Sequence, residues 1–163
     1  MKNTLKANSL LSLIRAWKDF HQAVISAADT EGTSAPLQDI YGLKGALPAF
    51  FTGEFISRTI VNTIHTEQFE GRTFSTQKDF IVITASQKEA DEFETDLHSA
   101  AGESIEIIKF PWWGTIPYRS ISKRSAVFGE RESVLAKLSA KNPRGCLPRV
   151  FIIPQRSLVT PVP

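Results

Sequence analysis

Apolar residues recur along this chain at two kinds of spacing, which predict helices alternating with buried strands. Amphipathic spacing predicts helices over residues 9–28, 47–64, 87–101 and about 127–140. Short β-branched runs predict strands at "DFIVITAS", "IEIIKF" and "RVFIIP", and "LQDIY" is a further strand candidate. Strands that are apolar on both faces and alternate with helices are typical of a parallel sheet covered on both sides. The pattern therefore predicts an α/β fold with a parallel sheet flanked by helices.

Polar stretches separate these elements. The segments "DTEGTSAP" and "FEGRTFSTQK" predict connectors, and "PWWGTIPYRSISKRS" predicts a longer loop. Ser86 precedes the third helix, and Glu89 follows three residues later, which is the pattern of a capping box. In "QRSLVTPVP", after the last strand, we expect no packed element.

Composition narrows the class of protein. The chain has 163 residues, of which 42% are hydrophobic and 22% charged, as in soluble globular domains. No run reaches the roughly 18 apolar residues that a membrane span needs, and "SLLSLI" reads as part of a helix rather than a signal peptide. Cys146 is the only cysteine, and the histidines share no metal-ligand spacing, so we expect a cytoplasmic protein without cofactor or metal.

The stretch "YGLKGALPAFF" begins like a phosphate-binding loop. On the pattern G-x-x-x-x-G-K-[ST], Gly42 takes the first glycine position and Leu47 the second. Pro48 stands where a lysine would reach the phosphates, and Ala49 stands where a hydroxyl would hold magnesium. We interpret Gly42, Gly45, Pro48 and Ala49 as a degenerate phosphate loop that does not hydrolyse ATP; the alternative is an ordinary turn into a helix.

A second candidate site combines aromatic and basic residues in the loop after "IEIIKF". Rings beside cations could stack on bases and follow a phosphate backbone, which would make the loop a platform for single strands. Alternatively, the tryptophans cap the sheet and Arg131 pairs within the fold, which is the interpretation we favour. The candidate nucleic-acid contacts are Trp112, Trp113, Tyr118, Arg119, Lys123 and Arg124.

The triplet at Asp91–Phe93 superficially matches a helicase Asp-Glu pair. It lies inside a predicted helix and not at the carboxyl end of a strand, where magnesium would be held. We therefore interpret its acids as exposed helix surface.

A family resemblance joins these segments. The ordered motifs "GLKGALPAFF", "VITASQKEADEFETDL", "FPWWGTIPY", "GERESVLAKL" and "VFIIPQRSL" resemble the N-terminal, UvrB-like region of bacterial transcription-repair coupling factors (Mfd). The match runs from about Tyr41 to Leu158, and the loop "FPWWGTIPY" followed by "GER" is its most specific part. The chain departs from the family pattern at Ala46, where serine is common, and in "VFIIP".

The resemblance implies a fold and a role. The fold would be P-loop NTPase or helicase-like, similar to the first domain of UvrB but incomplete, with a helix and linker at 1–36 and the subdomain at 37–163. The whole protein would be an ATP-dependent DNA translocase in transcription-coupled repair, with UvrA, RNA polymerase and DNA as partners. This chain would be a non-catalytic scaffold that ends before the UvrA-binding insert. The alternative is a free-standing DNA-binding or nucleotide-binding module.

Overall fold

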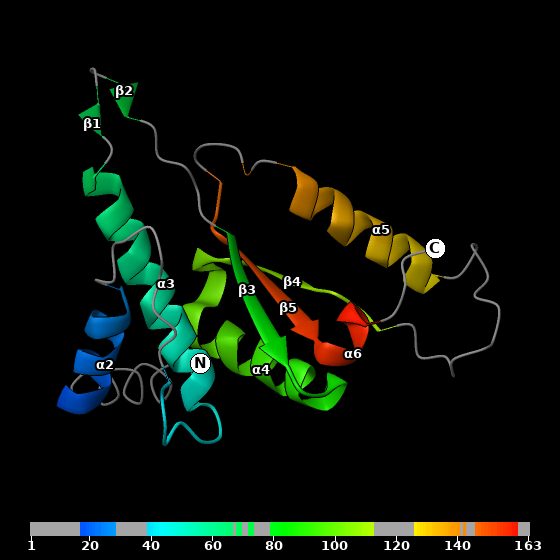
Figure 1. Ribbon diagram of the computed structural model, residues 1–163, viewed down its shortest axis with the longest axis horizontal. Helices are drawn as coiled ribbons and strands as arrows, with labels where there is room; N and C mark the ends of the chain where they lie inside the picture. Colours follow the sequence, from blue (N-terminus) through cyan, green and yellow to red (C-terminus); the bar gives the residue numbers. More distant parts are fainter. Residues whose placement is uncertain are drawn as a thin grey trace, which may run out of the picture. The chain divides into compact units, whose positions relative to one another are not determined.

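The computed structural model divides into two compact units, formed by residues 1–75 with 96–102 and by residues 76–95 with 103–163 (Figure 1). It describes residues 17–28, 39–66, 68–69, 72–73, 79–112, 126–140, 142 and 146–159. The helices are α2 (Lys18–Ala28), α3 (Leu47–Thr66), α4 (Gln87–Ala101), the 3-10 turn η1 (Gly102–Ser104), α5 (Ala126–Ser139) and α6 (Gln155–Leu158). The strands are β1 (Gln68–Phe69), β2 (Arg72–Thr73), β3 (Asp79–Thr84), β4 (Glu106–Lys109) and β5 (Arg149–Pro154).

In the first unit, α2 packs against α3 through aromatic rings. The ring of Phe20 meets that of Phe51 edge-on, with centroids 5.9 Å apart. Val24 of α2 and Ile56 of α3 are fully buried. Because these residues recur at helical spacing, each helix places one apolar stripe on the other.

The end of α4 belongs to the same unit and approaches α3 at a glycine. A Cβ atom built on Gly53 would lie 3.6 Å from Cβ of Ala100 and 3.8 Å from a methyl group of Leu97. These are ordinary contact distances, so the two helix backbones come close here without requiring the glycine. Leu97 is fully buried at this contact.

The second unit contains a parallel sheet with the strand order β3–β5–β4. β5 lies in the centre, pairs with both neighbours in parallel, and is buried along its whole length. Within this sheet, β3 and β4 do not pair with each other, and β4 and β5 are parallel, so neither consecutive pair of its strands forms a hairpin. The expectation of an α/β fold with a parallel sheet is confirmed.

Opposite faces of this sheet carry different helices (Figure 1). On one face, Phe151 and Ile108 form a core with Val134 of α5, and Leu135 and Leu138 pack against it. On the other face, Lys109 of β4 reaches α4, where its Nζ bonds Asp91 and Glu94. α4 and α5 therefore flank the sheet from its two sides.

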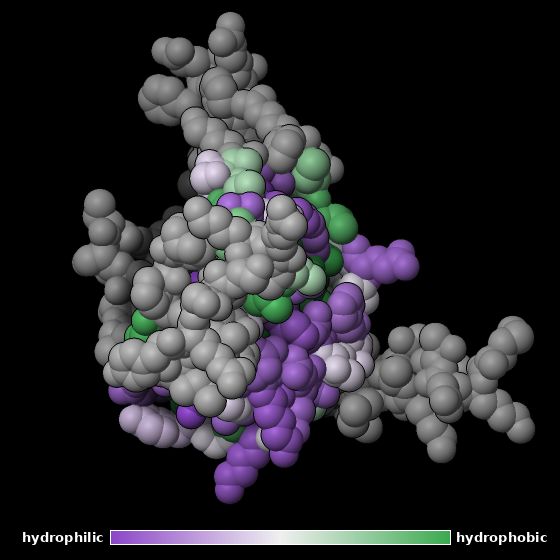
Figure 2. Space-filling model, turned by 90° about the vertical axis from the view of Figure 1, so that its right-hand side faces the viewer, coloured by the Kyte–Doolittle hydropathy of each residue, from purple (hydrophilic) through white to green (hydrophobic). Residues whose placement is uncertain are grey.

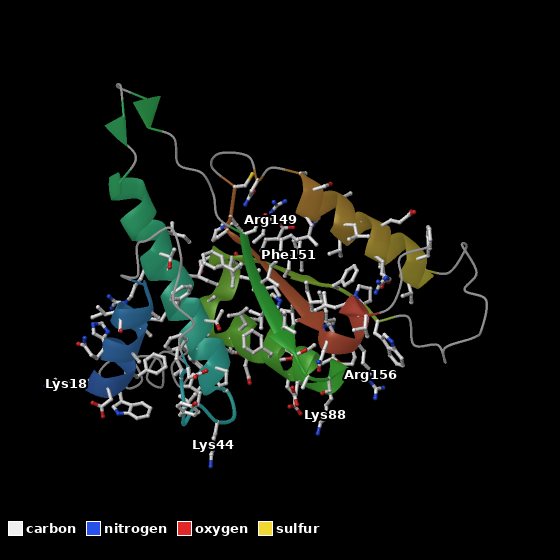
Figure 3. The ribbon with its side chains drawn as sticks, in the orientation of Figure 1. Lys18, Lys44, Lys88, Arg149, Phe151 and Arg156 are labelled. Carbon is white, nitrogen blue, oxygen red and sulfur yellow. The ribbon has the colours of Figure 1, made fainter. Side chains whose placement is uncertain are left out.

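Arg149 joins three elements at the amino end of the central strand (Figure 3). Its guanidinium forms a two-pronged ion pair with Asp79 of β3, with N–O distances of 2.8 and 2.6 Å. The same group donates to the carbonyl oxygens of Lys137 and Ala140 at the end of α5, each at 2.8 Å. A cation at a helix carboxyl end also interacts favourably with the helix dipole. These bonds to Asp79 raise the pKa of Arg149, so the group stays charged.

Several predicted elements match the structure closely. α4 has the predicted bounds, and α3, α5 and the strands β3 to β5 lie where the apolar pattern placed them. In the predicted first helix, the described residues are helical from Lys18, and residues 9–16 lie outside the described part. The proposed boundary at residue 36 also lies outside it and stays a prediction.

Other expectations are wrong. Asp39 to Tyr41, the described part of the strand candidate "LQDIY", is irregular. The polar connector contains the paired strands β1 and β2. A short helix, α6, follows β5 directly, although we expected no packed element there, and its Ser157 is buried. β3 is not buried on both faces, because Ile81 and Ile83 are exposed.

Helix length and hydropathy also bear on a membrane location. Among the described residues, no helix combines the length and the apolar character that crossing a bilayer requires.

Candidate functional site

The glycine turn before α3 uses its own backbone donors. Gly42 and Gly45 have positive φ angles of 85° and 60°, which glycine adopts without a steric cost. The amide of Leu47 donates to the carbonyl of Lys44 at 3.3 Å, and Ala49 donates to Ala46 at 3.1 Å. The next amide, of Phe50, also donates to Ala46 at 3.2 Å. The amides of Leu47, Ala49 and Phe50 are therefore already occupied by carbonyls of the turn.

This arrangement differs from a phosphate cradle. A cradle points several backbone amides outward at the anion. Here Pro48, in the first turn of α3, has no amide to offer, and the amides on either side of it are already bonded. Ala49 is only 1% exposed, so its side chain fills the interior. Lys44 extends away from the turn (Figure 3).

The start of α4 is also capped by local hydrogen bonds, from residues next to the helix end. The hydroxyl of Ser86 accepts the amide of Glu89 at 3.2 Å, as the capping box predicts. The carboxylate of Glu89 accepts the amide of Ala85 at 3.0 Å, one residue before the position that the motif specifies. These bonds occupy donors that would otherwise be open to an anion.

Asp91, from the helicase-like triplet, lies on the exposed surface of α4. Its carboxylate bonds Lys109 Nζ at 2.8 Å, and Glu94 bonds the same atom at 2.7 Å. The bond from Lys109 is the largest cause of the lowered pKa of Asp91, and the bond to Asp91 is the largest cause of the raised pKa of Lys109. These acids bond the last residue of β4, are occupied by its ammonium group, and so hold α4 to the sheet.

The carboxyl ends of the three parallel strands lie together at one edge of the sheet. In open α/β sheets, ligands usually bind beyond the carboxyl ends of the strands. Trp112 follows β4, Arg156 follows β5, and Lys88 follows β3 at the start of α4. The guanidinium carbon of Arg156 lies 5.7 Å from the centre of the Trp112 ring, within cation–π distance. Lys88 and Arg156 project at this end of the sheet (Figure 3).

Arg131 fixes the backbone behind this edge. It is 1% exposed and donates to the carbonyl of Pro111 at 2.8 Å and to that of Ser157 at 3.3 Å. Its guanidinium lies 4.1 Å from the centre of the Phe110 ring. Burial lowers the pKa of Arg131, but an arginine remains protonated in proteins. The interpretation that Arg131 pairs within the fold is confirmed.

The structure describes only part of the predicted aromatic-basic site. Trp112 is half-buried at the sheet edge. The other predicted contacts, Trp113, Tyr118, Arg119, Lys123 and Arg124, lie outside the described residues, and their role stays a prediction. Sequence reasoning missed Arg156, although its position two residues after the predicted strand "RVFIIP" was the signal for it.

The described residues are mostly polar on one face of the molecule, and their acids and histidines form no metal-binding group. Figure 2 views the molecule from the right-hand side of Figure 1, and the described residues on this face are mostly hydrophilic with small apolar patches. Within the described ranges, no three His, Cys, Asp or Glu side chains gather as metal ligands would.

No protein-family model matches the chain, and the searches of curated proteins and of solved structures found no similar protein.

Proposed function

We propose that this chain is a non-catalytic scaffold from the N-terminal region of a transcription-repair coupling factor. The proposal is supported by the ordered motifs between Tyr41 and Leu158 and by the α/β class of the fold. In the full protein, a separate translocase would hydrolyse ATP, displace stalled RNA polymerase on DNA and recruit UvrA. This part would sit in the cytoplasm as a P-loop-like domain that has lost its nucleotide chemistry.

The observation that carries the non-catalytic role is the closed turn before α3. Phosphoryl transfer needs outward amides, a cation and a magnesium ligand. The turn offers Pro48 and Ala49 at the side-chain positions, and its amides donate to Lys44 and Ala46. The segment therefore supplies neither the cation nor the magnesium ligand, and three of its amides already have backbone acceptors.

A nucleotide-binding assay tests this role. Thermal unfolding of the chain should be unchanged by MgATP, MgADP or inorganic phosphate. A ligand present at 100 times its Kd would add about 2.7 kcal/mol to the unfolding free energy. Magnesium-dependent stabilisation of that size, or hydrolysis above the rate of a heat-denatured sample, would refute the scaffold role.

The assignment to a coupling factor has a separate test. The natural reading frame should continue past Pro163 into a UvrA-binding insert and helicase motifs. The full product should bind UvrA and RNA polymerase, while the present chain alone should bind UvrA weakly or not at all. A stop codon directly after Pro163 in the natural gene would contradict this assignment.

A second candidate function is contact with single-stranded nucleic acid at the carboxyl edge of the sheet. The cation–π pair of Arg156 and Trp112 favours it, because a guanidinium and an indole both offer planar faces to a base. The acids of α4, including the exposed Asp91 and Glu92, would repel a phosphate backbone. A strand would therefore lie over the ends of β4 and β5 rather than over α4.

Fluorescence anisotropy with labelled single-stranded and duplex DNA, titrated with salt, tests this contact. Arg156→Gln should weaken single-strand binding and reduce its salt dependence, as should charge removal at Arg119, Lys123 and Arg124. Lys18→Gln, which removes an exposed cation from α2, is the matched control and should change little. Equal binding by all variants, or no binding by the wild type, would exclude the contact.

A further inference from the structure

The outer edge of β3 has exposed apolar side chains and outward-facing backbone groups. Ile81 is 59% and Ile83 is 60% exposed, although both are β-branched residues in the middle of a strand. Within the described part of the chain, β3 pairs only with β5. An uncharged, apolar edge of this kind is a template for pairing with another strand.

The register of the sheet shows which backbone groups face outward. Glu106 donates to Pro148 at 2.8 Å and Phe110 donates to Ile152 at 2.9 Å, so the even-numbered residues of β5 face β4. Odd-numbered residues of β5 therefore face β3, and Phe151 is in register with Ile81. In a parallel ladder such a residue bonds the neighbours of its register partner. It follows that the N–H and C=O groups of Ile81 and Ile83 point away from β5.

We propose that two copies of this chain pair antiparallel through β3, around a two-fold axis at Val82. In this register, Ile81 of each copy lies opposite Ile83 of the other, and both lie on the sheet face that α5 covers elsewhere. These opposite residues form the hydrogen-bonded pairs of an antiparallel ladder, because their backbone groups face outward. The four isoleucines then shield one another laterally across the new strand pair. The pairing is independent of the proposed repair function.

Charge and area define the character of this dimer. Phe80 to Thr84 carry no charge, and Asp79, at the end of the strand, is already neutralised by Arg149 at 2.6 Å. No like charges therefore oppose each other across the axis, as specific association requires. A stable interface buries about 1,200–2,000 Å² in total, and one pair of short strands supplies less. The dimer should accordingly be weak and form only at high protein concentration.

Sedimentation equilibrium over a wide concentration range tests the proposal. The wild type should shift from the mass of one chain toward that of two. Ile83→Lys should weaken dimerisation at least tenfold, because it places a cation at the strand pair. Ile81→Pro should do the same by removing an outward N–H while leaving the bonds to β5 intact. Leu147→Lys, at a residue that is 47% exposed outside the strand, is the matched control and should dimerise as the wild type does.

Two further readouts keep the result interpretable. Far-ultraviolet circular dichroism and urea midpoints should show that each variant is folded. In a mixed sample of labelled and unlabelled chains, a filtered NMR experiment should show Val82 Hα close to Val82 Hα of the second copy, since this is a non-hydrogen-bonded pair. A monomer throughout the concentration range would overturn the proposal, as would a dimer that Ile83→Lys and Ile81→Pro leave intact.

Discussion

Replacing Arg131 with methionine tests whether a buried guanidinium holds the sheet's carboxyl edge together. Methionine fills a similar volume but cannot donate to the carbonyls of Pro111 and Ser157, which lie 2.8 and 3.3 Å from the guanidinium. Each hydrogen bond to a charged group contributes about 1.5–3 kcal/mol. Relief of the desolvation cost that lowers the pKa of Arg131 offsets part of the loss. We therefore expect Arg131→Met to reduce the unfolding free energy by about 3 kcal/mol.

Urea denaturation measures this loss, with the fluorescence of Trp112 reporting on the affected edge in a background where the other tryptophans are phenylalanine. Arg131→Lys is the informative comparison, because a lysine keeps the charge but lacks the planar fork that reaches two carbonyls. It should lie between the wild type and Arg131→Met. Buried charges replaced by apolar residues are sometimes neutral or stabilising. A methionine variant as stable as the wild type would therefore show that the bonds of Arg131 only compensate its burial, and our account of the edge would fail.

Three further predictions concern acid stability and glycine positions. The Asp91–Lys109 bond lowers the pKa of Asp91, so its contribution is present above the unfolded pKa and is lost as pH falls through the folded value. Acid titration of unfolding should therefore be shallower for Asp91→Asn than for the wild type between about pH 5 and 2. Gly45→Ala should cost about 1 kcal/mol in thermal unfolding, because its φ of 60° strains any Cβ although space is open. Gly53→Ala should stabilise by up to about 1 kcal/mol, because the new Cβ meets Ala100 at ordinary contact distance in mid-helix; destabilisation would mean that α3 and α4 approach more closely than described.

Most helices and strands of the fold could be predicted from local patterns in the sequence. The helix at residues 87–101 was predicted with its observed bounds because a capping box marks its start and its apolar positions keep one period. β5 was evident from an uninterrupted apolar run, and its burial on both faces agrees with its central position. These features depend on neighbours in the chain, which a sequence displays directly.

The features that the sequence did not reveal depend on residues that are far apart in the chain but close together in the fold. The apolar run of β3 reads like that of β5, and only the sheet order shows that one side of β3 has no described partner. α6 has four residues, too few for a helical period to be recognised. Arg131 was expected to pair within the fold, and it precedes Val134, Leu135 and Leu138 at the spacing of one helix face, but its acceptors, the carbonyls of Pro111 and Ser157, lie far from it in the chain. That spacing was the available signal that its side chain is buried.

The position of the central strand has a consequence for biosynthesis. β5 follows both of its sheet neighbours in the chain, and its Arg149 pairs with Asp79, a residue 70 positions earlier. β3 and β4 each pair with β5 and not with each other, so neither gains a ladder until the chain beyond Arg149 has left the ribosome. Such long-range pairing slows folding and leaves apolar strands open in the nascent chain. Nascent chains arrested before β5 should accordingly recruit chaperones, and the chaperones should be released only once β5 has inserted between β3 and β4.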